Sequence, residues 1–212
     1  MNQKKLEAAE KYFLALYPGG FTHPEMVAIG KKHKMEQMVA LAKESFAKDC
    51  FAHEKNIIDA MIKVVSRSSM VSVFEKPKFK DFAHALSSQD RKHFVTGLYE
   101  LLHGNEKQGF ETVLDQLQKK KMAKWTLLTV VPAYFRSSKD VFIKPSTTKM
   151  IIEKLALDLV YKPTPSWDFY KKYRQYIKTM KTHVKTSLSP SNAAFCGFLM
   201  MSLPVQDQSD RL

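Results

Sequence analysis

The sequence predicts an all-α protein that folds as a single compact domain. The chain of 212 residues contains only 7 Gly and 9 Pro, below the roughly 12% expected for the two together, so it has few turn-forming residues. Apolar residues recur three and four positions apart along most of the chain, which is typical of amphipathic helices. With 44% hydrophobic and 26% charged residues, a chain of this length can bury a core without disulfides.

We expect about nine helices, and the first three follow from breakers and caps. The first covers residues 2–17 and ends at the Pro-Gly-Gly turn of residues 18–20. Thr22 can cap the second helix, whose apolar positions continue to Phe46. The third helix covers residues 52–67.

The segment that follows is ambiguous. In residues 70–80, Val71 and Val73 alternate with polar residues as in a strand, while Pro77 interrupts any long element. We expect a short helix only over residues 81–86.

Capping residues delimit the next two helices. A serine at 87–88 begins a helix that Gly104 ends, and Asn105 begins another that runs to about Lys121. Serine and asparagine are favoured at the start of a helix and glycine at its end, so the boundary between the two helices is expected near Gly104.

A strongly apolar, β-branched run over residues 125–135 follows. Pro132 makes it either a kinked buried helix or a strand, and we favour the helix. Residues 141–143 precede Pro145 and are expected to be extended, so any non-helical segment is short and lies near Val141.

The last helices are expected over residues 146–159, 166–185 and 193–202. Ser166 is expected to cap the middle one, and the Pro-Thr-Pro run at 163–165 is expected to lie outside any helix. No linker or internal repeat divides the chain, so we expect one α-helical domain over 1–203 and a polar, flexible tail over 204–212.

The charge is concentrated in one third of the chain. The formal net charge is +13, and residues 119–185 contain 16 basic and 4 acidic residues, a net charge of +12. A solvated basic surface explains this pattern, and so does a binding face for the phosphates of nucleic acid or anionic lipid.

Two basic groups stand out within this third. On the helix from Ser166, an apolar stripe from Phe169 to Val184 accompanies a basic stripe at helical spacing, and no acidic residue follows Asp168 in that helix. A basic knot precedes the apolar run at Trp125. The candidate nucleic-acid contacts are Lys119, Lys120, Lys121, Lys124, Lys171, Arg174, Lys178, Lys181 and Lys185.

Each basic group also has a structural explanation. Asp168 in the first turn and lysines toward the end complement the helix dipole, and the knot can end a helix and solvate a turn. The tyrosines of the helix are expected in the core rather than as base-stacking platforms.

Motifs for catalysis, cofactors and metals are absent from the sequence. The seven His and two Cys show no zinc-ligand spacing, so we expect no structural zinc or iron. No glycine-rich nucleotide loop or nucleophile elbow occurs, and we assign no cofactor and no catalytic residue. Two His–carboxylate pairs on single helices, Asp81 with His84 and Glu100 with His103, are expected to be local hydrogen-bonded pairs, or cationic His residues near a helix C-terminus, rather than sites.

Several tracts together resemble an uncharacterised bacterial family of proteins of about this length. They are Tyr17-Pro18-Gly19-Gly20-Phe21, Ser66-Arg67-Ser68-Ser69-Met70 with Phe74-Glu75-Lys76, Val141-Phe142-Ile143-Lys144-Pro145, Tyr161-Lys162-Pro163 with Trp167 and Tyr170, and Phe195-Cys196-Gly197-Phe198. The resemblance extends from about Phe13 to Phe198 and implies a bacterial, cytoplasmic, single-unit protein without transferring any catalytic residue. The chain departs from the family at His23, where an acidic residue is expected, and at Pro77, where the helix is expected to continue.

Three classes of function remain open at this stage. The first is a non-enzymatic or accessory protein that binds the phosphate backbone of nucleic acid through the basic groups. The second is an enzyme whose site is built from dispersed His and carboxylate residues. The third is a protein–protein adaptor that docks through the Met-rich second helix or the apolar C-terminal helix, and peripheral membrane contact is a weaker alternative.

The expected compartment is the cytoplasm. Two widely separated cysteines, Cys50 and Cys196, fit a reducing environment, and the first ten residues contain no apolar signal segment. The longest apolar run, residues 193–205, is too short to span a bilayer, so we expect no membrane insertion. The oligomeric state does not follow from the sequence.

Overall fold

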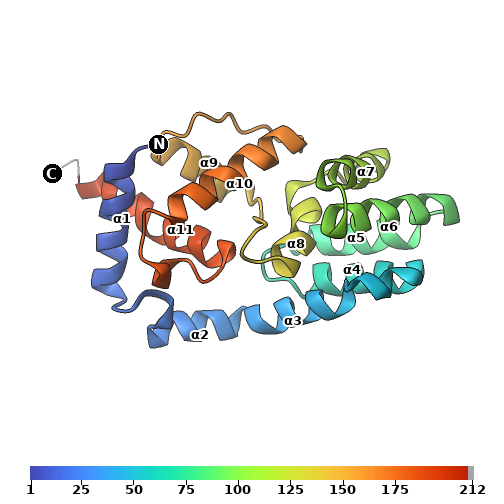
Figure 1. Cartoon of the computed structure of the whole chain (residues 1–212), viewed down its shortest axis with the longest axis horizontal. Helices are drawn as coiled ribbons and strands as arrows, with labels where there is room; N and C mark the ends of the chain where they lie inside the picture. Colours follow the sequence, from blue (N-terminus) through green and yellow to red (C-terminus); the bar gives the residue numbers. More distant parts are fainter. Residues whose placement is uncertain (210–212) are drawn as a thin grey trace.

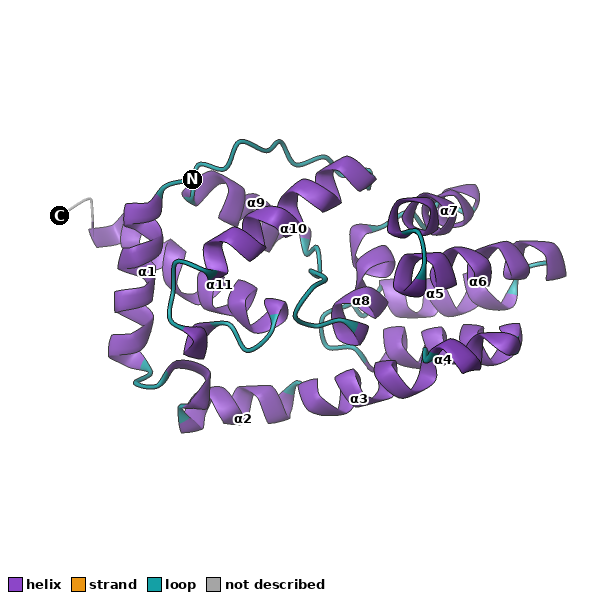
Figure 2. Ribbon diagram, viewed as in Figure 1, coloured by secondary structure: helices purple, strands orange, loops and turns teal. Residues whose placement is uncertain are grey.

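The computed structural model describes residues 1–209, and within that range every regular element is helical (Figure 2). The all-α prediction is confirmed, with eleven α-helices and three short 3-10 helices in place of the expected nine or so. The α-helices are α1 (Gln3–Leu16), α2 (Pro24–Lys32), α3 (Met35–Ser45), α4 (Glu54–Arg67), α5 (Glu75–His84), α6 (Ser88–His103), α7 (Glu106–Lys119), α8 (Trp125–Phe135), α9 (Pro145–Lys154), α10 (Trp167–Lys181) and α11 (Asn192–Ser209).

The helices form two packed groups that share one hydrophobic core. In Figure 1, α4 to α8 lie at one end of the molecule, α1 and α9 to α11 lie at the other, and α2 and α3 run along one edge between them. The pairs α6–α7, α3–α8 and α4–α5 pack against each other in the first group, and α11 packs against α1 and α9 in the second.

The closest helix pair, α6 and α7, depends on glycine. A Cβ atom at Gly109 would lie 2.0 Å from the backbone nitrogen of Leu101, and one at Gly97 would lie 2.8 Å from the side chain of Thr112. Only glycine allows the two backbones to approach this closely. The pair therefore forms a rigid support for the residues that α7 carries.

The apolar run after the basic knot is the central helix, α8. Residues 125–134 are all buried, and Pro132 lies inside the helix, so the helical interpretation of this run is confirmed. The extended segment near Val141 packs against it without forming a strand. The Thr129 hydroxyl accepts a hydrogen bond from Ile143 N at 3.0 Å, and the Tyr170 hydroxyl accepts one from Val141 N at 3.4 Å. Side chains thus replace the sheet partners that these buried backbone groups lack.

Two N-terminal boundaries differ from the prediction. The expected helix over 22–46 is two helices, because Lys34 adopts a left-handed conformation (φ 53°) that an α-helix cannot contain. His23, not Thr22, caps α2, and its Nδ1 accepts a hydrogen bond from Glu25 N at 3.4 Å.

The short helix expected over residues 81–86 begins earlier in the structure, within the segment that the sequence left ambiguous. The helix α5 already begins at Glu75, which places Pro77 in the first turn. The first backbone N–H groups of a helix have no intrahelical partner, so a proline there removes no hydrogen bond.

Three C-terminal boundaries also shift. The helix α9 ends at Lys154 instead of residue 159, because Ala156 is left-handed (φ 48°). The helix α10 ends at Lys181, and α11 continues to Ser209 rather than to residue 202. Of the tail predicted over 204–212, residues 210–212 lie outside the described residues, and its flexibility stays a prediction.

The expected capping hydrogen bond of Ser166 is not formed. Ser166 stands at the N-cap position of α10 and the residues 163–165 lie outside any helix, as predicted. Its side chain, however, makes no capping hydrogen bond. A substitution of Ser166 by Ala should therefore cost less than the roughly 1 kcal/mol that a working cap contributes.

Candidate nucleic-acid interface

The helix α10 carries the predicted basic residues Lys171, Arg174, Lys178 and Lys181 beside its buried face, and Lys185 lies beyond the end of this helix. Phe169, Tyr173, Ile177 and Met180 are all buried, so this part of the apolar stripe belongs to the core, whereas Tyr176 is half-buried and Val184 lies beyond the end of α10. The basic residues divide into two classes, those whose side chains are exposed and those that the fold uses internally.

Arg174 belongs to the second class. Its guanidinium donates to Asp140 Oδ1 at 2.8 Å and to Glu106 Oε2 at 2.7 Å, and its side chain is only 17% exposed. Burial disfavours the charged form, but the hydrogen bonds to Glu106 and Asp140 and the nearby Tyr170 outweigh it and raise the pKa of Arg174. Arg174 is thus part of an internal ion-pair cluster that we name the Asp140 cluster: Glu106, Arg136, Asp140, Tyr170 and Arg174.

Asp140 is the centre of that cluster. Its carboxylate is fully buried and accepts hydrogen bonds from Arg136 Nε at 2.5 Å, from Arg174 Nη1 and from the Tyr170 hydroxyl at 3.0 Å. Its backbone oxygen accepts one from Asn192 Nδ2 at 3.1 Å. The cluster therefore joins α8, α10 and α11 around a carboxylate from an irregular segment.

Arg136 extends the Asp140 cluster to the α6–α7 pair. Its Nη1 and Nη2 donate to the carbonyl oxygens of Leu102 and Leu101 at 2.9 and 3.0 Å, at the end of α6. Glu106 in the first turn of α7 accepts from Arg136, Arg174 and Lys139. Every charged group of the cluster thus has a partner of opposite sign.

Two further predicted contacts are partly engaged. Lys181 Nζ donates to Asn192 Oδ1 at 2.9 Å, and burial lowers the pKa of Lys181. Lys119 lies 3.4 Å from Asp115 and 3.7 Å from Asp90, with half of its side chain exposed. Exposed pairs of this kind are weak, so Lys119 can exchange these partners for a phosphate.

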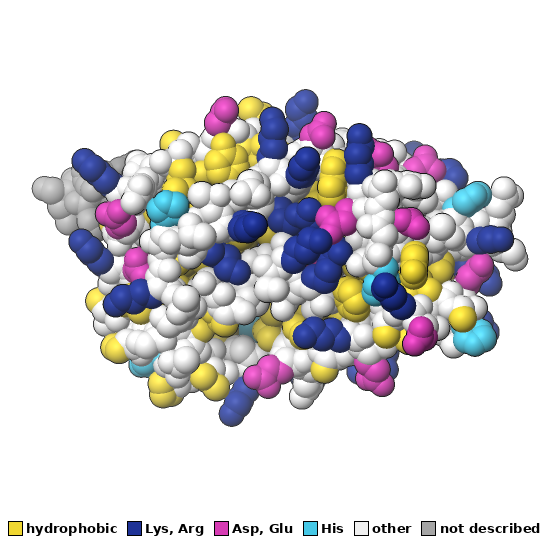
Figure 3. All heavy atoms as spheres, viewed as in Figure 1, with side chains coloured by type: hydrophobic (Ala, Val, Ile, Leu, Met, Phe, Trp, Pro, Cys, Tyr) yellow, Lys and Arg dark blue, Asp and Glu magenta, His cyan; other side chains and the backbone are white. Residues whose placement is uncertain are grey.

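The remaining predicted contacts are exposed. They are Lys120, Lys121, Lys124, Lys171, Lys178 and Lys185. In Figure 3, Lys and Arg side chains gather near the middle of the face shown, over the area where α8, α10 and the α8–α9 connection meet, and most acidic side chains lie toward the edge.

Trp125 brings part of the basic knot next to α10. Its ring centroid lies 5.1 Å from that of Phe169, and its Nε1 donates to the Lys162 carbonyl oxygen at 2.8 Å. Lys124 precedes Trp125 in the chain, so its backbone lies in the same region as Lys162 and the start of α10. Lys172, three residues after Phe169, projects from the same side of α10 as Phe169 and is exposed.

The structure therefore separates the basic residues into two exposed groups. The first, which we call the knot group, contains Lys120, Lys121 and Lys124 with Lys162 and Lys172, of which the sequence analysis missed the last two. The second, the stripe group, contains Lys171, Lys178 and Lys185. Lys171 and Lys178 are exposed on α10, whereas Lys185 lies after the end of this helix, and its backbone N donates to Glu10 Oε1 of α1 at 2.7 Å.

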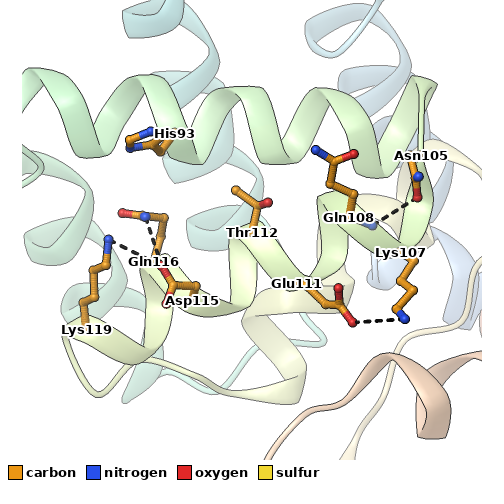
Figure 4. Close-up of a pocket in the computed structure, with 9 residues that line it drawn as sticks. All are labelled: His93, Asn105, Lys107, Gln108, Glu111, Thr112, Asp115, Gln116 and Lys119. Atoms are coloured by element: carbon orange, nitrogen blue, oxygen red, sulfur yellow. Dashed lines mark hydrogen bonds and ion pairs between the residues drawn. The ribbon is translucent and has the colours of Figure 1, made fainter.

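The groove between α6 and α7 is not suited to a polyanion. It encloses about 510 Å³ and is shallow and open (Figure 4). Its lining alternates in charge, with Lys107 paired to Glu111 at 3.9 Å and Lys119 paired to Asp115. A phosphate backbone in this groove would meet as many carboxylates as ammonium groups.

The groups considered for catalysis have structural partners. His103 Nε2 is 2.8 Å from the Phe46 carbonyl oxygen, and Glu100 accepts a hydrogen bond from Asn105 N at 2.7 Å, so these two residues do not form the expected local pair. Burial raises the pKa of the Cys196 thiol to about 12, which keeps it protonated and unreactive at neutral pH. Within residues 1–209, no three His, Cys, Asp or Glu side chains converge as metal ligands would.

Each of the two faces considered for an adaptor has both exposed and buried apolar residues. Val27 and Ile29 on α2 are 41% and 40% exposed, and Met200 on α11 is 44% exposed. Met26 and Met38 on the Met-rich helices are each 3% exposed. On α11, Phe195 and Phe198 are fully buried. These buried residues stabilise the fold and are not free to bind a partner.

Comparisons with known protein families, with curated proteins and with solved structures find no match to this chain, which is consistent with the resemblance to an uncharacterised family. Among the helices of residues 1–209, none has both the length and the apolar composition needed to cross a bilayer.

Proposed function

We propose that this protein binds nucleic acid through the phosphate backbone, as a non-enzymatic or accessory bacterial protein. The observation that supports the proposal is the exposure of lysines within the basic third of the chain. Ten of them are exposed and form no ion pair with a carboxylate of the described residues: Lys120, Lys121, Lys124, Lys144, Lys149, Lys162, Lys171, Lys172, Lys178 and Lys185.

The electrostatics of this surface fit a polyanion. The fold neutralises Arg174 and Arg136 internally with Asp140 and Glu106, so the exposed lysines contribute most of the uncompensated charge. A nucleic acid that replaces its condensed counterions with such lysines gains affinity from the release of those ions. Contacts of this kind carry little sequence information, so we expect little sequence preference.

The test is the salt dependence of binding to a labelled 20-base-pair duplex. With about five phosphates contacted, log K should fall with log salt with a slope of about −4 to −5. Two triple variants then locate the site: Lys171→Gln, Lys178→Gln and Lys185→Gln for the stripe group, and Lys120→Gln, Lys121→Gln and Lys124→Gln for the knot group. The triple variant that removes the contacts should flatten the slope by roughly 3.

A matched control removes the same charge elsewhere. Lys31, Lys43 and Lys55 are exposed on α2, α3 and α4, and changing all three to Gln should leave the slope within about one unit of the wild type. If the control variant loses as much affinity as the site variants, binding follows net charge and has no site. If the wild type shows no binding at about 50 mM salt and micromolar protein, the proposal is wrong.

A cytoplasmic location is part of the proposal. Cys50 and Cys196 are both free thiols, as is usual in a reducing compartment.

A further inference from the structure

An exposed aromatic side chain stands beside the knot group. Phe74 is 78% exposed and its neighbour Val73 is 69% exposed. The chain contains 14 Phe, and every one of the others is buried or half-buried. The core therefore does not use Phe74, and its place on the surface needs another explanation.

The backbone holds Phe74 in place on both sides. Before it, Val71 is buried, and Ser68 Oγ lies 3.0 Å from the Tyr134 hydroxyl. Phe74 N itself donates to Ser72 Oγ at 3.3 Å, and Phe79, five residues later, is buried. The ring is exposed because this anchored segment presents it to solvent.

A hydrogen bond between two helices places Phe74 next to the knot group. Glu75 Oε2 accepts from the Thr126 hydroxyl at 2.8 Å, and Thr126 is two residues after Lys124. On α5 itself, Lys78 follows Phe74 by one turn and projects from the same side of the helix. The hydrogen bond thus brings the start of α5, which carries Phe74 and Lys78, next to the first turn of α8, which follows the knot lysines in the chain.

We infer that Phe74 stacks on an unpaired base, and that the knot group and Phe74 together bind single-stranded nucleic acid in preference to duplex. The inference rests on the proposed function and names its substrate class. An unpaired base presents its flat face to a protein ring, whereas the bases of a duplex are stacked on one another inside the helix. The lysines of the knot group are placed to contact the phosphates that flank such a base.

A lipid surface fits this site less well. Membrane-surface helices bury a continuous apolar face. The apolar residues of α5, Phe79, Phe82 and Ala83, are buried in the core instead. Ser72, Val73 and Lys78 accompany Phe74 on the surface, so the exposed apolar area is limited to Val73 and Phe74. One ring among lysines is suited to a base next to phosphates.

The test compares three substitutions at Phe74 by fluorescence anisotropy with labelled dT20 and a labelled 20-base-pair duplex. Phe74→Ala should weaken dT20 binding about tenfold and leave duplex binding within twofold, because one stacked base contributes roughly 1–3 kcal/mol. Phe74→Leu should behave like Phe74→Ala, since it keeps an apolar side chain without a flat face, and Phe74→Trp should bind dT20 as well as the wild type. Leu16→Ala, at a half-exposed position on α1, is the control and should change neither affinity.

The outcomes separate this inference from the proposed function. If dT20 and duplex both bind with salt dependence and Phe74→Ala changes neither, the phosphate-binding proposal stands and the stacking inference is wrong. The stacking inference is also wrong if Phe74→Leu binds dT20 like the wild type. It is equally wrong if Phe74→Ala instead abolishes binding to vesicles of phosphatidylcholine and phosphatidylserine. If the wild type binds neither nucleic acid, both are wrong.

Discussion

Arg174 and Lys178 are one turn apart on the same helix and have opposite environments. Arg174 is 17% exposed and paired with Asp140 and Glu106, whereas Lys178 is exposed and pairs with no carboxylate of the described residues. In the sequence both belong to one basic stripe. The partners that distinguish them are 34 and 68 residues away from Arg174, so no local pattern could reveal the difference.

The comparison shows that a basic stripe along a helix can contain two kinds of residue, namely basic residues in buried ion pairs and exposed lysines. The Asp140 cluster stabilises the junction of α7, α8, α10 and α11, and its charges are already neutralised. Exposed lysines contribute little to stability, because surface charges in water interact weakly. The predictions below separate the two kinds by asking which substitutions change the free energy of unfolding and which change binding.

The largest effect is expected when Asp140 loses its charge. Asp140→Asn leaves Arg136 and Arg174 buried with one carboxylate fewer, and breaking a buried ion pair costs about 3–5 kcal/mol. Urea unfolding followed by circular dichroism measures the loss. Asp59→Asn, at an exposed position on α4, is the matched control and should change the free energy by less than about 0.5 kcal/mol. Equal effects at the two positions would mean that the cluster is not a stabilising centre.

A smaller effect is expected from substitutions on α10 itself. Arg174→Gln should cost about 2–3 kcal/mol, because Asp140 and Glu106 keep Arg136 as a partner. Lys178→Gln should leave the free energy of unfolding within about 0.5 kcal/mol of the wild type. In nucleic-acid binding the order reverses, and Lys178→Gln should have the larger effect on the salt slope. A stability cost for Lys178→Gln equal to that for Arg174→Gln would contradict the division of α10 into two kinds of residue.

Much of the fold could be predicted from the sequence, because the relevant signals are local. Asn105 and Gly104 mark the α6–α7 boundary through caps, and the apolar spacing of α10 gives its buried face directly. The errors occur where a single backbone conformation decides the result, as at Lys34 and Ala156. Lysine and alanine carry no preference for positive φ, so their sequence contains no signal for these breaks.

The candidate site could be predicted only in part, for a different reason. Local composition identified the lysines but not their surroundings, which depend on tertiary contacts such as the one between Trp125 and Lys162. The role of Phe74 was also not apparent, because an aromatic residue in an ambiguous segment is usually buried. A basic third of the chain indicates a binding surface, and only the fold shows which of its residues are exposed.

The smallest effect is expected from the pH dependence that Glu106 contributes. Burial raises its pKa, but hydrogen bonds from Lys139 and Arg174 and the charges of Arg174 and Arg136 outweigh burial and lower the pKa below its ordinary value of 4.5. A carboxyl whose pKa is lower in the folded state stabilises the fold fully above its unfolded pKa, and this stabilisation is lost as the pH falls toward the folded pKa. Between about pH 5 and about pH 3, the free energy of unfolding should therefore fall more steeply for the wild type than for Glu106→Gln.

Glu111→Gln is the control on the same helix, because Glu111 is 54% exposed and only weakly paired with Lys107. The curve of free energy against pH for Glu111→Gln should parallel that of the wild type. If the curves for Glu106→Gln and the wild type are parallel, the ion pairs of Glu106 do not stabilise the folded state. Asp140 would then be the only carboxylate of the cluster that stabilises the buried arginines, in contrast to the exposed lysines of the knot and stripe groups, which pair with no carboxylate of the described residues.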